Sequence, residues 1–162
     1  DEPLPLLYER VLPFEAQHAG ITSPPADYVV INVGTNDFFR GVPEATSWRS
    51  ALHALTLRVR QRNPSARLVL ALGPLLSDDY PVARARSILR GWLQDELERL
   101  RREGLLNVAF IEFWFDPAEG LGCQYHPSAR THARLGAELA ALLKPTATVD
   151  EKAMGDHSGG ED

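Results

Sequence analysis

The chain has 162 residues, of which 44% are apolar, and this is enough to build the core of one domain. A formal net charge of -5 and the absence of a dense basic run argue against nucleic acid as a partner. No apolar stretch approaches the roughly 18 residues of a membrane helix, so we expect no membrane partner. Cys123 is the single cysteine, which excludes an internal disulfide and a thiolate metal cluster.

Residues 1–26 contain many prolines and no sustained period, and they predict a connecting loop. Residues 27–34 are mostly β-formers, apolar on both faces, and predict a buried parallel strand that ends in glycine. Over residues 44–62 apolar side chains recur at intervals of three and four, which predicts a helix that Pro64 ends.

Residues 66–72 predict a second buried strand, and residues 81–103 predict a second helix with leucines on one face. Residues 107–111 predict a third strand, which a last helix over residues 128–143 follows. This alternation is typical of the doubly wound α/β class, with parallel strands and right-handed crossovers. Residues 146–162 are polar and largely acidic or small, and predict a disordered tail with no enzymatic role.

The segment that follows the first predicted strand is a candidate for chemistry, because ligands of doubly wound sheets bind outside the carboxyl ends of the strands. This segment reads Gly34-Thr35-Asn36-Asp37. The glycine permits a sharp turn, and the amide of Asn36 could then stabilise a carbonyl oxygen that becomes an oxyanion. The alternative is an ordinary Asx-type turn that caps the next segment.

A second candidate segment, Gly122 to Ser128, precedes the last predicted helix. Pro127 disfavours helical geometry at His126, so we expect the imidazole to stay in the loop. Histidine is the side chain most often used as a general base. The alternative is a histidine that packs against the helix or caps it. His132, on the inward face of that helix, is expected to pack in the core.

Together the two segments, Asp27 to Phe38 and Gly122 to Ser128, resemble the third and fifth sequence blocks of SGNH (GDSL-type) hydrolases. Within that superfamily they are most similar to carbohydrate esterase family 2, whose members deacetylate xylan and related glycans. The similarity extends over about residues 4–143. It implies a three-layer α/β/α sandwich with a parallel, flavodoxin-like sheet, of which residues 27–145 would form a part that is incomplete at the amino terminus.

The resemblance implies hydrolysis of a carboxylic ester through an acyl-serine, with Asn36 as an oxyanion donor and His126 as the base. It implies an acetylated carbohydrate or other small ester as the substrate, and a secreted or extracytoplasmic location. We expect no metal, because the histidines outside these segments have no partners at metal-ligand spacing, and we expect no cofactor. Gly34, Trp114 and Tyr125 are the expected substrate-binding residues. The ring of Trp114 could stack on a sugar, or it could be buried under the last helix.

The chain departs from the family pattern at Cys123, three residues before His126, where most SGNH enzymes have an aspartate. Family 2 also tends to lack this aspartate, so the departure favours that subfamily. Glu112 or Asp116 could orient the histidine instead, although each could equally be a solvated charge.

The larger departure is that the Gly-Asp-Ser block with the nucleophile, and the glycine that gives a second oxyanion donor, are absent from this sequence. None of its serines follows a predicted strand in that context. We therefore expect a carboxy-terminal part of an enzyme whose amino-terminal segment supplies the serine. The alternatives are a non-catalytic remnant that binds glycan, and an SGNH lipase or thioesterase.

Overall fold

A computed structural model describes residues 7–8 and 24–144 of the chain. Most of the predicted connecting loop and all of the predicted acidic tail lie outside the described residues. The regular elements in chain order are β1 (Tyr28–Asn32), η1 (Thr35–Arg40), α2 (Ala45–Arg62), β2 (Arg67–Leu72), α3 (Ala85–Arg102), β3 (Val108–Glu112), η2 (Pro117–Glu119), η3 (Cys123–Tyr125) and α4 (Ala129–Leu143).

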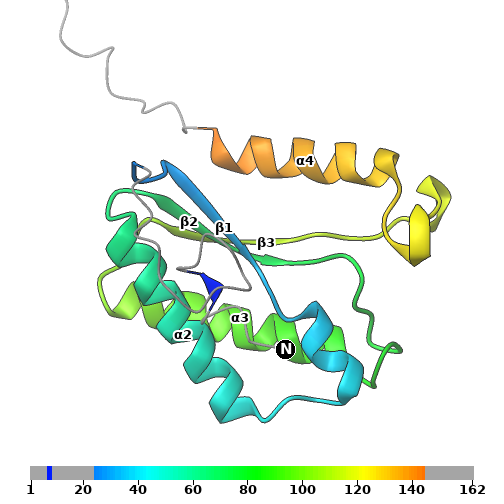
Figure 1. The fold of residues 1–162 in the computed structure, drawn as a ribbon, viewed down its shortest axis with the longest axis horizontal. Coiled ribbons are helices and arrows are strands. Elements are labelled where there is room, and N and C mark those ends of the chain that lie inside the picture. The colour runs from blue at the N-terminus through cyan, green and yellow to red at the C-terminus, as the bar shows by residue number, and fades with distance from the viewer. Residues whose placement is uncertain (1–6, 9–23, 145–162) are drawn as a thin grey trace, which may run out of the picture.

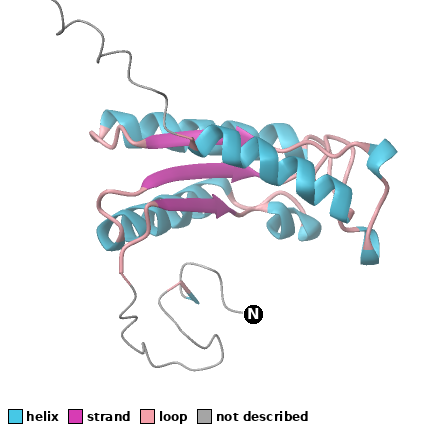
Figure 2. Ribbon diagram, turned by 90° about the horizontal axis from the view of Figure 1, so that it is seen from above, coloured by secondary structure: helices cyan, strands magenta, loops and turns pink. Residues whose placement is uncertain are grey.

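The three strands form one parallel sheet in the order β1-β2-β3. Val30 pairs with Val69 on β2, which in turn pairs with Ala109 on β3. Helices α2 and α3 cover one face of this sheet, and α4 lies on the opposite face (Figure 1; Figure 2). The predicted α/β class, with a parallel sheet between two layers of helix, is confirmed.

The larger part of the core lies between the sheet and the α2/α3 layer. Strand β2 is the centre of this core, since it is buried along almost its whole length. Alternate residues of β2 face α3, as the two-residue period of a strand requires. The fully buried leucines of this layer are Leu68, Leu70, Leu72, Leu89, Leu93 and Leu100. None of the helices among the described residues is long and apolar enough to cross a membrane.

The second face of the sheet is covered less completely. Leu135 of α4 packs on Ala71 and Phe113, near β2 and the end of β3. Strand β1 lies at the edge, where Tyr28 is 44% exposed and Val30 is 37% exposed. Apolar side chains of β1 therefore remain accessible on the face that α4 occupies.

Helix α3 begins later than its apolar pattern predicts, at Ala85 in place of Pro81. Arg84 has a left-handed backbone, with a φ of 63°, which a helix cannot continue through. Its N–H donates to the Asp78 carbonyl at 2.8 Å, so the preceding residues form a closed loop. The loop lies beyond the carboxyl end of β2, where residues 74–78 and Tyr80 line a cavity.

Helices α2 and α3 are joined by a polar contact inside their interface. Glu96 of α3 is buried, and its Oε1 lies 2.9 Å from Nδ1 of His53 on α2. Burial raises the pKa of the Glu96 carboxyl above its ordinary value, and the contact with His53 offsets part of that effect.

A carboxyl whose pKa is raised on folding binds more protons in the folded chain, so its contribution to stability is lost as pH rises through the folded pKa. Glu96→Gln removes this titration. We expect the melting temperature of the variant, relative to the unmodified chain, to increase from about pH 4 to about pH 8 when followed by circular dichroism. Glu98→Gln, at an exposed position of the same helix, is the control and should show no trend. A relative melting temperature that falls with pH contradicts the prediction.

Candidate active site

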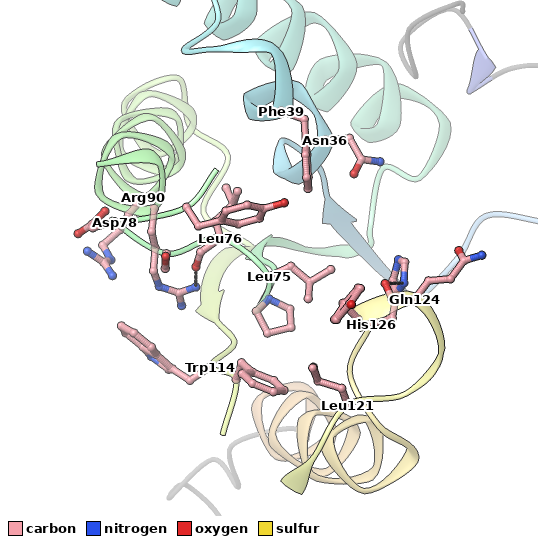
Figure 3. A pocket seen from close by; sticks show the side chains of 16 residues that line it. Asn36, Phe39, Leu75, Leu76, Asp78, Arg90, Trp114, Leu121, Gln124 and His126 are labelled. Atoms are coloured by element: carbon pink, nitrogen blue, oxygen red, sulfur yellow. Dashed lines mark hydrogen bonds between the residues drawn. The ribbon is translucent and has the colours of Figure 1, made fainter. Parts of the chain in front are cut away.

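Asn36 is held at the end of β1 by the short helix η1. Phe38 of η1 is fully buried, and its ring packs on Trp92 with the centroids 5.7 Å apart. Asp37 accepts a hydrogen bond of 3.1 Å from the indole nitrogen of Trp48. Because the two residues after it are anchored, the exposed side chain of Asn36 is presented at the carboxyl edge of the sheet (Figure 3).

The turn before Asn36 requires glycine for two separate reasons. Gly34 has a φ of +105°, a left-handed conformation that side chains with a Cβ rarely adopt. A Cβ built on Gly34 would also lie 2.8 Å from both methyl carbons of Leu89. Both the backbone and the packing of α3 therefore fix the direction in which the chain leaves β1.

His126 lies in the loop between η3 and α4, as the proline after it predicts. The start of α4 is capped by Ser128, whose Oγ accepts from the Thr131 N–H at 3.2 Å. The same hydroxyl donates to the Glu119 carbonyl at 2.8 Å, which ties the loop to η2. The backbone N–H of Gly122 donates to the His126 carbonyl at 2.7 Å and closes the loop from its other side.

The ring of His126 contacts main-chain carbonyls of its own loop. Its Nδ1 lies 3.1 Å from the Gln124 oxygen and 3.3 Å from the Cys123 oxygen. Carbonyls only accept hydrogen bonds, so these contacts place the hydrogen on Nδ1 and leave the lone pair on Nε2. Gln124 and Tyr125 both have positive φ, 51° and 62°, which is strained backbone for residues other than glycine.

Two cavities meet at Asn36 and His126. The first has a volume of about 840 Å³, and in Figure 3 Asn36 and His126 lie on one side of it while Trp114 and Arg90 lie on the other. The second, of about 670 Å³, lies between the end of β1 and α4. The structure thus brings together the two side chains that the sequence selected, and Gly34 lines the second cavity.

The first cavity has largely apolar walls. Trp114 is 55% exposed and Tyr125 is 82% exposed, and both line it. Phe113, next to Trp114 in the sequence, is instead buried against Leu135. The lining residues that the sequence did not single out include Phe39, Leu75, Leu76, Tyr80 and Leu121.

Arg86 and Arg90 of α3 form ion pairs with Glu112 beside Trp114. The sequence pattern did not predict this network. The Oε1 atom of Glu112 lies 2.8 Å from Nη2 of Arg86, and Arg90 donates to both of its carboxylate oxygens. Burial opposes ionisation of Glu112, but the hydrogen bonds from Arg90 and the charge of Arg86 outweigh it and lower its pKa. Burial also lowers the pKa of Arg86, although Glu112 opposes this. The sequence feature that could have revealed this network is Arg86 itself, a charged residue three positions before Leu89 on the apolar face of α3.

Three expectations about side chains near His126 can be compared with the structure. Glu112 is engaged by arginines, and Asp116 accepts from the Ala118 N–H at 2.9 Å, so the described contacts of His126 involve neither carboxylate. The expectation for His132 is wrong, because this residue is exposed and lines the second cavity. Helix α4 leaves the β1 side of the sheet open, so the position of His132 is not covered, although Leu135 of the same helix is buried. Among the described residues, no three His, Cys, Asp or Glu side chains are grouped to hold a metal ion.

Comparison with known proteins assigns the chain to a family. The model of the GDSL-like Lipase/Acylhydrolase family matches residues 5–134. The chain belongs to this family. The match covers the Asn36 and His126 segments together, and it confirms the resemblance to SGNH (GDSL-type) hydrolases.

The similar proteins include carbohydrate esterases of family 2. Cellulase/esterase CelE of Acetivibrio thermocellus is 31% identical over 147 residues, which are 88% of this chain and 17% of CelE. A family two carbohydrate esterase from Clostridium thermocellum, solved in complex with cellohexaose, has a TM-score of 0.78 and 29% identity, covering 86% of this chain and 42% of that one. A Corynascus thermopiles (Myceliophthora fergusii) family 2 enzyme with a carbohydrate binding domain has a TM-score of 0.70 and 28% identity, covering 88% and 44%. The chain therefore spans less than half of these solved relatives and about a sixth of CelE.

We expect Gly34→Ala to destabilise this GDSL-family chain by roughly 3 to 5 kcal/mol, because the new Cβ adds both backbone strain and a collision with Leu89. Urea unfolding followed by circular dichroism measures the loss. Gly41→Ala is the matched control, since Gly41 also has a positive φ but no atom within 4 Å of a built Cβ. It should cost roughly 1 to 3 kcal/mol for strain alone. Equal losses in the two variants would contradict the packing described for Gly34.

Proposed function

We propose that this chain carries part of an ester-hydrolysing site in which His126 is the general base and Asn36 donates to the oxyanion. The observation that carries the proposal is that these side chains, ninety residues apart in sequence, line the same two cavities at the carboxyl edge of the sheet. Membership of the GDSL-like Lipase/Acylhydrolase family supports acyl transfer as the chemistry.

In the proposed reaction a serine hydroxyl attacks the ester carbonyl carbon while Nε2 of His126 accepts the serine proton. Negative charge develops on the carbonyl oxygen, to which the Asn36 amide donates a hydrogen bond. His126 then returns the proton to the departing alcohol, and water hydrolyses the acyl-serine by the same route. The carbonyls of Cys123 and Gln124 hold the ring through Nδ1, in the position that a carboxylate has in a Ser-His-Asp triad.

The nucleophile is proposed to come from a segment that precedes residue 1 in the complete protein. Of the serines within the described residues, Ser77 alone lines either of the two cavities, and its hydroxyl accepts a hydrogen bond of 3.2 Å from the Asp79 N–H. Strand β1 is an edge of the described sheet, so a further strand could pair beside it. Solved relatives of which this chain covers 41% to 44% are in line with a longer protein.

The proposed substrate is an acetylated carbohydrate. Flat aromatic rings match the faces of pyranose sugars, and Trp114 and Tyr125 are proposed to contact the sugar. Gly34 is proposed to contribute backbone to the floor of the second cavity. A glycan ligand is supported by the similar esterase solved with cellohexaose.

A second candidate function is glycan binding without turnover. The observation that favours it is that the first cavity combines exposed aromatic side chains with His126, whereas none of the described hydrogen bonds of His126 involves a serine. The two candidates share a ligand and differ in whether a nucleophile reaches Nε2.

We expect the 162-residue chain to hydrolyse p-nitrophenyl acetate no faster than its His126→Ala variant, because no serine of the chain is proposed to be activated by this histidine. Initial rates at matched protein concentration measure this. Ser77→Ala is the control for the serine that lines the cavity. A rate that drops on both substitutions would show that Ser77 acts as the nucleophile, and would contradict the proposed origin of the serine.

In a longer protein that includes a Gly-Asp-Ser block, His126→Ala should lower kcat on an acetylated sugar by about a thousandfold, as expected for loss of the general base. Asn36→Ala should lower kcat by about a hundredfold or more, with little change in KM, since the oxyanion exists only during reaction. Thr35→Ala, one residue away on η1, is the control for changes in the helix. Full activity in the His126 variant would exclude His126 as the general base, and a lack of turnover by the unmodified longer protein would leave the binding function.

A further inference from the structure

Trp114 needs a fixed ring plane if it is to act as a stacking surface, yet it lies in a loop with much of its ring exposed. Contacts from both helix layers hold it. The guanidinium carbon of Arg86, on α3, lies 3.9 Å from the centroid of the indole ring. From the opposite layer, Nη2 of Arg134 on α4 donates to the Trp114 carbonyl at 2.8 Å. The ring is therefore held by α3 and the backbone by α4.

Arg86 is itself immobilised more completely than a surface arginine. It is only 4% exposed. Its Nη1 donates to the carbonyls of Gly73 at 3.3 Å and Leu76 at 3.0 Å, in the loop after β2. Its Nη2 donates to the Phe113 carbonyl at 2.7 Å and pairs with Glu112, at the end of β3. One guanidinium thus links the loops after β2 and β3, which line the first cavity on the side opposite Asn36 and His126.

We propose that Arg86 is a positioning residue that acts on ligand binding through Trp114. The inference rests on the proposed function, because it takes Trp114 as the surface on which the sugar stacks. Arg86 lies 3.9 Å and Arg90 5.7 Å from the centroid of the indole ring, and the ligand stacks on the part of the ring that these cations do not cover. The planar fork of arginine supplies donors to both loops while stacking on the ring, and the single ammonium of lysine cannot do both.

The first test uses the free 162-residue chain and the indole N–H signals of its three tryptophans in ¹⁵N–¹H spectra. Trp114→Phe assigns the Trp114 signal. Arg86→Lys should shift and broaden that signal. The signals of Trp48 and Trp92, which are half-buried and pack against each other, should stay in place. Arg99→Lys, an exposed position on the same helix that pairs with Glu103, is the matched control and should change none of them. A folded Arg86→Lys chain with an unchanged Trp114 signal overturns the proposal.

If Arg86→Lys fails to fold, Trp114→Ala tests the same contact from the other partner. The Nε atom of Arg86 is buried without a hydrogen-bond partner among the described residues, and it belongs to the guanidinium that lies over the Trp114 ring. The chemical shift of its N–H proton therefore depends on the presence of that ring. We expect this signal to move when the indole is removed. An unmoved signal overturns the proposal.

The second test is a double-mutant cycle with cellohexaose as the probe, titrated into the same chains. Arg86→Lys should weaken binding about fivefold, and Trp114→Ala should weaken it at least as much. In the Trp114→Ala background, Arg86→Lys should have no further effect, because its partner is gone. Equal affinity of Arg86→Lys and the unmodified chain, or additive losses, overturns the proposal. Failure of the unmodified chain to bind cellohexaose would count against the carbohydrate substrate, and the spectra of the free chain would still decide the role of Arg86.

Discussion

Parallel pairing of β1, β2 and β3 is the constraint on which the candidate site depends. Because the strands run in one direction, the segments that follow Asn32, Leu72 and Glu112 all emerge at the same edge of the sheet. Asn36 and Trp114 therefore line one cavity although almost eighty residues separate them in sequence. An antiparallel arrangement of the same strands would have sent one of these segments to the other end of the molecule.

The two sides of the site are built to different degrees of rigidity. On the side of Trp114, the loops after β2 and β3 are fixed by the buried Arg86, by its partner Glu112 and by three carbonyl oxygens that accept from Arg86. On the side of His126, the loop is closed by its own backbone and by the cap of α4, and two of its residues have left-handed backbone. The wall that contains Trp114 and the loop that contains His126 are thus separate parts of the fold, which is why the effects of substitutions at Arg86 and His126 can be distinguished.

Much of this arrangement could be predicted from the sequence, because strands and helices of this chain follow simple apolar periods and the family blocks have a fixed separation. The start of α3 could not, since the left-handed Arg84 is a tertiary feature of a closed loop. The exposure of His132 depends on how far α4 extends over the sheet, which periodicity does not encode. The role of Arg86 could not be predicted either, because its four partners come from segments that are adjacent only in the fold.

Strand β1 has a consequence for the behaviour of the chain in solution. A strand edge with accessible Tyr28 and Val30 is a template on which another chain can add its own strand. A net charge of -5 opposes such association only weakly at physiological ionic strength, where charges are screened within about 8 Å. A charged side chain on an edge strand opposes such pairing, so Val30→Lys is expected to raise the solubility of the chain.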